Sequence, residues 1–285
     1  MKLTPEIKAI ISHALKEDRV FRDYTTRGLS IENLNITAVI YAGVDGRLAG
    51  LDIAREVFKS LGKIRWSPVI EDGCDFRAGD EIVKINAKAE VILGGERTAL
   101  NFLSHLSGVA TFTKRFVELV SKNKIKIYDT RKTLPGLRKL DKYAVKIGGG
   151  YNHRIDLSQA LMIKDNHVNS FRKVYPGSDY IVEMVRRLRK RYPGKELIIE
   201  VHGFQEWEQA IKACPDVVMF DNWKPEDIEI ALKMIGKKRR KFEIEISGNI
   251  NLEQLEKIME LGIDRISLGK ITHSAPAIDF SLEVI

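Results

Sequence analysis

Six short apolar runs in the second half of this chain each end at a polar residue or a glycine of the kind that enzyme sites use. The runs and the residues after them are Lys126–Tyr128 before Asp129, Leu161–Ile163 before Lys164, Leu197–Ile199 before Glu200, Val217–Phe220 before Asp221, Phe242–Ile246 before Ser247, and Arg265–Leu268 before Gly269. Helix-length stretches separate most of them, as in alternating strands and helices. In a βα barrel the active site lies at the carboxyl ends of the strands. The pattern therefore predicts a βα barrel and the composition of its site.

The first half of the chain has a different pattern, which predicts a mixed α/β domain. A helix is expected over residues 4–19, a strand and turn over 36–50, a helix over Leu51–Leu61 and β structure with turns over 64–93. A long helix from about Gly95 to Lys122 then links this domain to the barrel repeats, which begin near Lys124.

Composition places limits on the class of protein. The 285 residues are 44% hydrophobic and 30% charged, as in soluble globular proteins. No apolar run approaches the roughly 20 residues that span a bilayer, and the first residues show no secretory signal. Cys74 and Cys214 are expected to be free thiols in a reducing cytosol, so a cytoplasmic location is predicted, with no membrane partner.

The net charge of +8 raises the alternative of nucleic-acid binding. Two basic runs stand out, Arg186–Arg191 and Lys237–Lys241, and each precedes a predicted strand, where a helix would end. Cations at that position favour the negative end of the helix dipole. Solvated helix termini are therefore the preferred interpretation, and no nucleic-acid partner is expected.

A basic set of residues follows the first barrel strands. Its members are Arg131, Lys132, His153, Arg154 and Lys164, with three consecutive glycines at residues 148–150 ahead of His153. If the strand ends converge, these groups share one cavity, where they need ion-pair partners or an anionic ligand. Arginine suits carboxylates and phosphates. The alternative is a network of structural salt bridges.

Two acidic residues, Glu200 and Asp221, each follow an apolar run and are expected at the same mouth. Carboxylates opposite an anion-binding set can hold ribose hydroxyls and Mg²⁺, or stabilise a developing oxocarbenium ion. The structural alternative for each is capping of the next helix.

Small residues follow the last two predicted strands, in Ser247-Gly248-Asn249 and Ser267-Leu268-Gly269. The final loops of a βα barrel often bind phosphate through backbone N–H groups and a helix N-terminus. Together the three sets indicate a ligand with a phosphate, further anionic groups and a sugar. Phosphoribosyl transfer and sugar-phosphate isomerisation both fit this description.

Several long motifs resemble those of the quinolinate phosphoribosyltransferase family, also called nicotinate-nucleotide pyrophosphorylase (carboxylating). The segments that carry the resemblance are Glu96–Leu103, Asp129–Arg138, Gly148–Arg154, Met162–His167, Val218–Asn222 and Ile266–Ser274. The resemblance implies an α/β fold with an N-terminal open α/β sandwich domain and an incomplete, TIM-like βα barrel. It implies domains over residues 1–107, joined by the tail 274–285, and over 108–273.

The resemblance also implies a reaction and its cofactor. Quinolinate and phosphoribosyl pyrophosphate would give nicotinate mononucleotide, pyrophosphate and CO₂, with Mg²⁺, in NAD biosynthesis. The enzyme would be a homodimer with shared active sites, either alone or assembled into a hexamer.

Roles carry over from the family residue by residue. Arg97, Arg131, His153 and Arg154 would hold quinolinate, with Arg97 reaching across the dimer. Lys132, Lys164, Glu200 and Asp221 would be catalytic and bind phosphoribosyl pyrophosphate, and Glu200 and Asp221 would also serve Mg²⁺. The phosphate cradle would comprise Ser247, Gly248, Asn249, Ser267 and Gly269, with His273 nearby.

The chain departs from the family pattern at two positions. Ile198 replaces the first acid of the usual Glu-Val-Glu strand, and His202 leaves a second register open for Glu200. Asn249 replaces the last glycine of Ser-Gly-Gly. The nearest rival is a pyrophosphorylase of the molybdenum-transport type, against which Lys164-Asp165-Asn166-His167 favours the quinolinate enzyme.

Overall fold

The computed structural model describes residues 1–235, 241–248, 250 and 252–285, and it divides into two compact units. The first unit comprises residues 1–116, 132–150 and 270–285, and the second comprises 117–131 and 151–269. The tail 274–285 thus belongs to the first unit, and so do residues 108–116 and 132–150, which the sequence places in the barrel.

The first unit is built on a four-stranded antiparallel sheet in the order β12-β1-β5-β3. Its strands are β1 (Asn35–Ala42), β3 (Ile64–Pro68), β5 (Glu81–Lys88) and β12 (Phe280–Val284). A separate two-stranded ribbon joins β2 (Gly46–Arg47) to β4 (Asp75–Phe76). The tail strand β12 pairs with β1, so the C-terminal residues complete this sheet.

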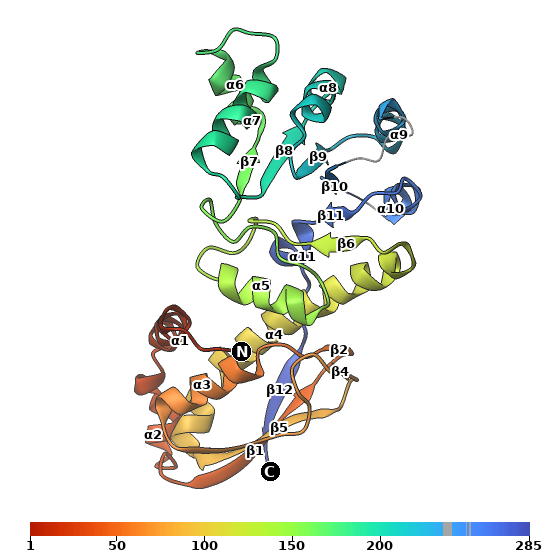
Figure 1. Cartoon of the computed structure of the whole chain (residues 1–285). Coiled ribbons are helices and arrows are strands. Elements are labelled where there is room, and N and C mark those ends of the chain that lie inside the picture. The colour runs from red at the N-terminus through yellow and green to blue at the C-terminus, as the bar shows by residue number, and fades with distance from the viewer. Residues whose placement is uncertain (236–240, 249, 251) are drawn as a thin grey trace. The chain divides into compact units, whose positions relative to one another are not determined.

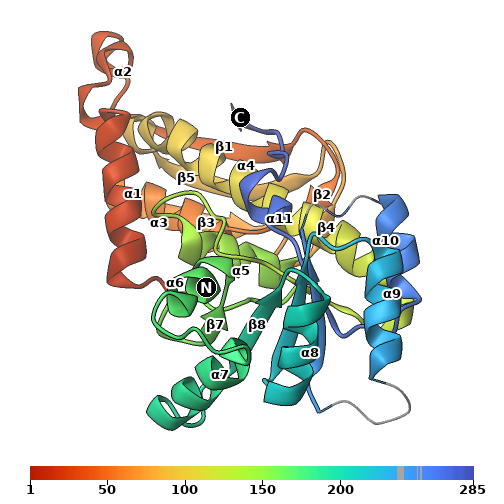
Figure 2. The same ribbon diagram turned by 90° about the horizontal axis from the view of Figure 1, so that it is seen from above.

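Helices cover one side of this antiparallel sheet (Figures 1 and 2). The helices of the first unit are α1 (Pro5–Glu17), η1 (Val20–Arg22), α2 (Tyr24–Gly28), α3 (Leu51–Leu61), α4 (Ala89–Val120), α5 (Arg138–Ile147) and α11 (Lys270–His273). The bounds of α3 match the prediction, and its first N–H groups are capped by Asp72, which accepts from Gly50 N and Leu51 N at 3.0 Å each.

Helix α4 begins six residues earlier than the sequence predicts, and the reason is packing. A Cβ atom at Gly95 would lie 2.7 Å from the Phe58 ring. Gly95, where the sequence analysis places the start of the helix, lies inside α4 and lets it approach α3 closely.

The second unit is built on a six-stranded parallel sheet in the order β6-β11-β10-β9-β8-β7. The strands are β6 (Lys126–Tyr128), β7 (Leu161–Ile163), β8 (Leu197–Val201), β9 (Val217–Asp221), β10 (Glu243–Ser247) and β11 (Arg265–Ser267). All six predicted runs are therefore strands. Because β6 and β7 are the two edges, the barrel is open, which confirms the prediction of an incomplete TIM-like barrel.

Helices lie along the outer side of this curved sheet, as Figure 1 shows for α7 to α10. The helices of the second unit are η2 (Ser121–Asn123), α6 (Asp165–Arg172), α7 (Tyr180–Arg191), α8 (Phe204–Ala213), α9 (Pro225–Met234) and α10 (Leu252–Met259). The indole of Trp207 anchors this layer, since it is fully buried against Phe220 and donates from Nε1 to the Ala231 carbonyl at 2.9 Å.

The basic run Arg186–Arg191 ends α7, as the sequence predicts. Arg186 and Arg187 pair with Glu183 at 2.6 and 2.7 Å, and Arg189 pairs with Asp216 at 2.8 Å. Three of its cations thus have carboxylate partners. The second run, Lys237–Lys241, lies outside the described residues except for Lys241.

No helix in the described part of the chain is long and apolar enough to cross a membrane.

Candidate active site

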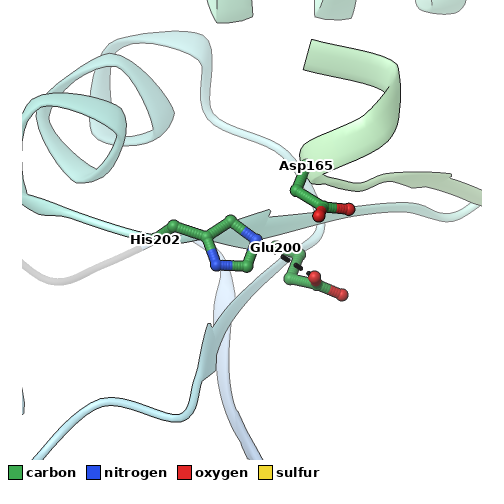
Figure 3. Close-up of side chains that lie close together, drawn as sticks. All are labelled: Asp165, Glu200 and His202. Carbon is green, nitrogen blue, oxygen red and sulfur yellow. Dashed lines mark hydrogen bonds and ion pairs between the residues drawn. The ribbon is translucent and has the colours of Figure 1, made fainter. Parts of the chain in front are cut away.

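A cation, two carboxylates and an imidazole meet at the carboxyl ends of β7 and β8. The Lys164 ammonium lies 2.7 Å from Glu200 Oε2, and His202 Nε2 lies 3.1 Å from Glu200 Oε1. The Asp165 carboxylate projects nearby from the start of α6 (Figure 3), and ligand atoms of Asp165, Glu200 and His202 all lie within 4.8 Å of one another. Glu200 is 5% exposed, so its charge is held by these two partners rather than by water.

Local structure places these side chains. Glu200 lies inside β8 rather than after it, and His202 is two residues further on, so both point to the same side of the strand. Lys164 is the N-cap of α6, and its backbone N–H donates to His167 Nδ1 at 3.1 Å. Glu200 and His202, the residues between which the sequence left the register open, thus both face this cluster.

Arg131 and Arg154 bring two guanidinium groups together after β6. Arg154 is 9% exposed, and its Nη1 donates to the Ala160 carbonyl at 3.1 Å. Burial, and then the nearby charge of Arg131, lower the pKa of Arg154. The Nε of Arg131 is buried and has no hydrogen-bond partner among the described residues. Neighbouring like charges with an unused buried donor favour an anionic ligand.

The backbone that carries Arg154 is held at the edge of the sheet. Tyr151 forms a parallel bridge to Tyr128, which extends the sheet beyond β6. The fully buried Asp129 accepts from His153 N at 2.8 Å. His153 Nδ1 in turn accepts from Arg154 N at 2.9 Å, and His153 Nε2 lies 3.5 Å from Glu245 Oε1. Both ring nitrogens of His153 thus face protein groups.

Asp221 ends β9 next to the loop of small residues. The loop conformation requires glycine at 248, because φ is +127° and a Cβ there would lie 2.5 Å from Asn222 Oδ1. Asn222 N donates to the Ser247 carbonyl at 3.0 Å and joins the two strand ends. A hollow of about 350 Å³ beside them is lined by His202, Gly203, Phe204, Asp221, Asn222, Trp223, Lys224 and Asp227.

The other cradle residues have different surroundings. Ser267 is 1% exposed on β11, and its hydroxyl faces Glu245. Gly269 lies two residues after the end of β11, and Asn249 lies outside the described residues.

Two predicted site residues belong to the first unit. Arg97 lies on α4 with 65% of its side chain exposed, beside a hollow of about 350 Å³ that Glu17, Asn101 and His105 also line. Lys132 is exposed, and its carbonyl accepts from Thr272 Oγ1 at 2.7 Å. His273 Nδ1 lies 2.6 Å from Ser274 Oγ.

Sequence reasoning assigned no site role to Asp129, Asp165 or Glu245. Asp129 and Asp165 lie inside the motifs that carry the family resemblance, and their place in those motifs could have identified them as site residues. Glu245 sits within an apolar run as Glu243-Ile-Glu-Ile246, where alternation could have placed it on the same side of β10 as Ser247.

Two family models cover almost the whole chain. Residues 23–107 match the model described as quinolinate phosphoribosyl transferase, N-terminal domain. Residues 109–283 match the model described as quinolinate phosphoribosyl transferase, C-terminal domain.

Relatives and solved structures agree with this match. A Bacillus subtilis protein named probable nicotinate-nucleotide pyrophosphorylase [carboxylating] is 37% identical over 280 residues, which are 98% of this chain and 93% of the relative. A Methanocaldococcus jannaschii protein of the same name is 37% identical over 284 residues, 97% of this chain and 96% of the relative. The solved structure of the nicotinate-nucleotide pyrophosphorylase from Francisella tularensis superimposes with a TM-score of 0.88 at 37% identity, covering 99% and 98% of the two chains.

Proposed function

The chain belongs to the quinolinate phosphoribosyltransferase family, and from this premise we propose how its residues carry out the family reaction. The enzyme transfers the phosphoribosyl group of phosphoribosyl pyrophosphate to quinolinate. Decarboxylation follows, and the products are nicotinate mononucleotide, pyrophosphate and CO₂. The reaction serves NAD biosynthesis.

The observation that carries the site assignment is the guanidinium pair. Arg154 is buried beside Arg131, whose Nε has no hydrogen-bond partner among the described residues. A dicarboxylate supplies the charge and the paired acceptor geometry that two guanidinium forks require. Arg131 and Arg154 therefore bind the two quinolinate carboxylates. His153 contributes by holding the Arg154 backbone through Nδ1.

The carboxylates of Glu200 and Asp221 act on the ribose of phosphoribosyl pyrophosphate. Cleavage of the bond from C1 to pyrophosphate develops positive charge at C1, which Glu200 and Asp221 stabilise electrostatically. The contacts of Glu200 with Lys164 and His202 fix its carboxylate in advance of the reaction. The pyridine nitrogen then attacks C1, and the cationic ring accepts the electron pair released as the 2-carboxylate leaves as CO₂.

The phosphate groups meet cations and backbone donors. Lys132 and Lys164 neutralise the departing pyrophosphate, and the loop from Ser247 to Asn249, with Ser267 and Gly269, holds the 5′-phosphate. The positive φ of Gly248 supports this role, since a side chain there would close the approach to the loop.

The donor set suits Mg²⁺. Magnesium is usually held by one or two carboxylates together with substrate phosphates. Asp221 lines an open hollow at the end of β9, while Glu200 already faces a lysine and a histidine. Asp221 would hold the ion directly, Glu200 would act beside it, and the bound ion would offset charge on the pyrophosphate.

The enzyme is proposed to act as a homodimer in the cytoplasm. The exposed Arg97, beside a hollow in its own unit, is a side chain that can complete the quinolinate site of a second subunit. The same dimers could assemble further into a hexamer, and sedimentation velocity would distinguish the two states. Mixing an Arg97→Ala chain with an Arg131→Ala chain tests shared sites, because hybrid dimers should regain activity that neither variant has alone.

The reaction is tested by incubating the protein with phosphoribosyl pyrophosphate, Mg²⁺ and either quinolinate or nicotinate, and separating the nucleotide products. Nicotinate mononucleotide should form from quinolinate and not from nicotinate. Formation from nicotinate alone would keep phosphoribosyl transfer and overturn the dicarboxylate site.

A further inference from the structure

Glu245 is a buried carboxylic acid to which the mechanism described above assigns no role. It lies on β10, two residues before Ser247, and is fully buried. Burial raises the pKa of Glu245 to about 7, although the Ser267 hydroxyl and the charge of Arg265 act in the opposite direction. Burying a carboxylate is costly unless other groups compensate, so the groups that face it define what it can do.

The His153 ring faces Glu245 with its Nε2 atom. That atom lies 3.5 Å from Glu245 Oε1, and the two side chains are 6% and 0% exposed. The other ring nitrogen, Nδ1, accepts a hydrogen bond from Arg154 N at 2.9 Å. An acceptor nitrogen carries no proton, so the proton of the neutral ring lies on Nε2, which is 3.5 Å from Glu245 Oε1 and outside hydrogen-bond geometry in this structure.

The other charged groups near Glu245 are already paired. Arg265 contacts Glu243 through Nε and lies 3.0 Å from Glu196 through Nη2, and its guanidinium stacks over the Tyr128 ring. The groups that act on the charge of Glu245 are thus Ser267 and Arg265 from β11, Glu243 from β10 and Glu196 before β8, with His153 in direct contact. Since Arg265 is shared between two carboxylates, the groups that can donate to Glu245 are the Ser267 hydroxyl and the His153 ring.

We propose that Glu245 is a positioning residue for the quinolinate site: it accepts the Nε2 proton of His153, fixes that tautomer, and so keeps Nδ1 available to anchor the backbone that carries Arg154. This proposal rests on the function given above for Arg154. It assigns Glu245 no contact with substrate. Its effect reaches the substrate through the ring of His153 and the main chain of Arg154.

The kinetic test compares three variants at pH 8. Glu245→Leu removes the acceptor and should raise the KM for quinolinate about tenfold, with a smaller change in the KM for phosphoribosyl pyrophosphate. Glu245→Gln retains an acceptor oxygen and should stay within about threefold of the wild type. Glu243→Gln, on the same strand but paired with Arg265, is the matched control and should leave the quinolinate KM unchanged. An unchanged quinolinate KM in Glu245→Leu, or equal losses for both substrates, would overturn the proposal.

A spectroscopic test needs no activity and separates this proposal from the proposed function. In ¹⁵N-histidine-labelled protein, the His153 signals are identified by their loss in His153→Gln. The wild type should show a protonated Nε2 and an unprotonated Nδ1, and Glu245→Gln should retain this tautomer while Glu245→Leu loses it. A wild-type ring protonated on Nδ1 would refute the role of Glu245. Correct NMR signals in a protein without quinolinate activity would instead count against the proposed function alone.

Discussion

Replacing Gly248 by alanine tests whether the loop after β10 binds the 5′-phosphate. The backbone φ of +127° lies in a region that is nearly restricted to glycine. The new Cβ would lie 2.5 Å from Asn222 Oδ1 and 3.1 Å from Asn222 N. The side-chain oxygen can turn away, but the backbone nitrogen is tied to the Ser247 carbonyl at 3.0 Å. The loop itself must therefore move.

The size of the effect follows from this strain. A residue forced into such a conformation costs about 1–3 kcal/mol. If the loop relaxes by giving up its phosphate-binding shape, that cost appears as weaker binding of phosphoribosyl pyrophosphate. At about 1.4 kcal/mol per factor of ten, the KM for phosphoribosyl pyrophosphate should rise roughly 5- to 150-fold. The KM for quinolinate should change much less.

The assay is steady-state kinetics with each substrate varied in turn, together with urea unfolding. Gly194→Ala is the matched control, since Gly194 also has a positive φ, of +80°, but a Cβ there would meet nothing within 4 Å. The control should lose some stability and keep both KM values. If Gly248→Ala behaves like Gly194→Ala in both measurements, the loop does not bind the phosphate.

Three further changes test other parts of the site. Arg154→Lys should raise the quinolinate KM about 10- to 100-fold, because an ammonium cannot replace a buried two-pronged donor, and an unchanged value would remove Arg154 from the site. Lys164→Met leaves the buried carboxylate of Glu200 with His202 alone, so urea unfolding should show a loss of about 1–2 kcal/mol, whereas equal stability would mean that water replaces the lysine. Glu245→Gln should become more stable relative to the wild type as pH rises from about 4.5 to 7. The pKa of Glu245 is raised to about 7 in the folded protein, so in this window the folded wild type holds a proton that the unfolded chain has released. The free energy of unfolding of the wild type therefore falls as pH rises, and that of Glu245→Gln does not. A difference in unfolding free energy that does not vary with pH would show that Glu245 titrates normally.

The sequence predicted the second unit well because a parallel strand and the residue that ends it form one local pattern. Each apolar run is a strand, and alternation within a strand decides which side chains share a face. Lys164 and Glu200, which come from different strands, could be expected together for that reason alone, and they form an ion pair at 2.7 Å.

The sequence could not predict which side chains from distant segments contact each other. Glu245 and His153 are 92 positions apart by number, and only the order of β6, β11 and β10 in the sheet brings their segments near each other. The start of α4 was missed for a similar reason, since Gly95 disfavours a helix locally but is needed where the helix meets Phe58. In both cases a contact between distant segments overrides the local signal.

The stoichiometry of CO₂ tests the central claim, that a site with two guanidinium groups turns a dicarboxylate into a mononucleotide. Quinolinate labelled in its 2-carboxylate is supplied with phosphoribosyl pyrophosphate and Mg²⁺, and labelled CO₂ and pyrophosphate are counted together. The account predicts one CO₂ for each pyrophosphate in the wild type and neither product in Arg131→Ala at the same quinolinate concentration. Pyrophosphate release without CO₂, or equal turnover in the variant, would contradict it.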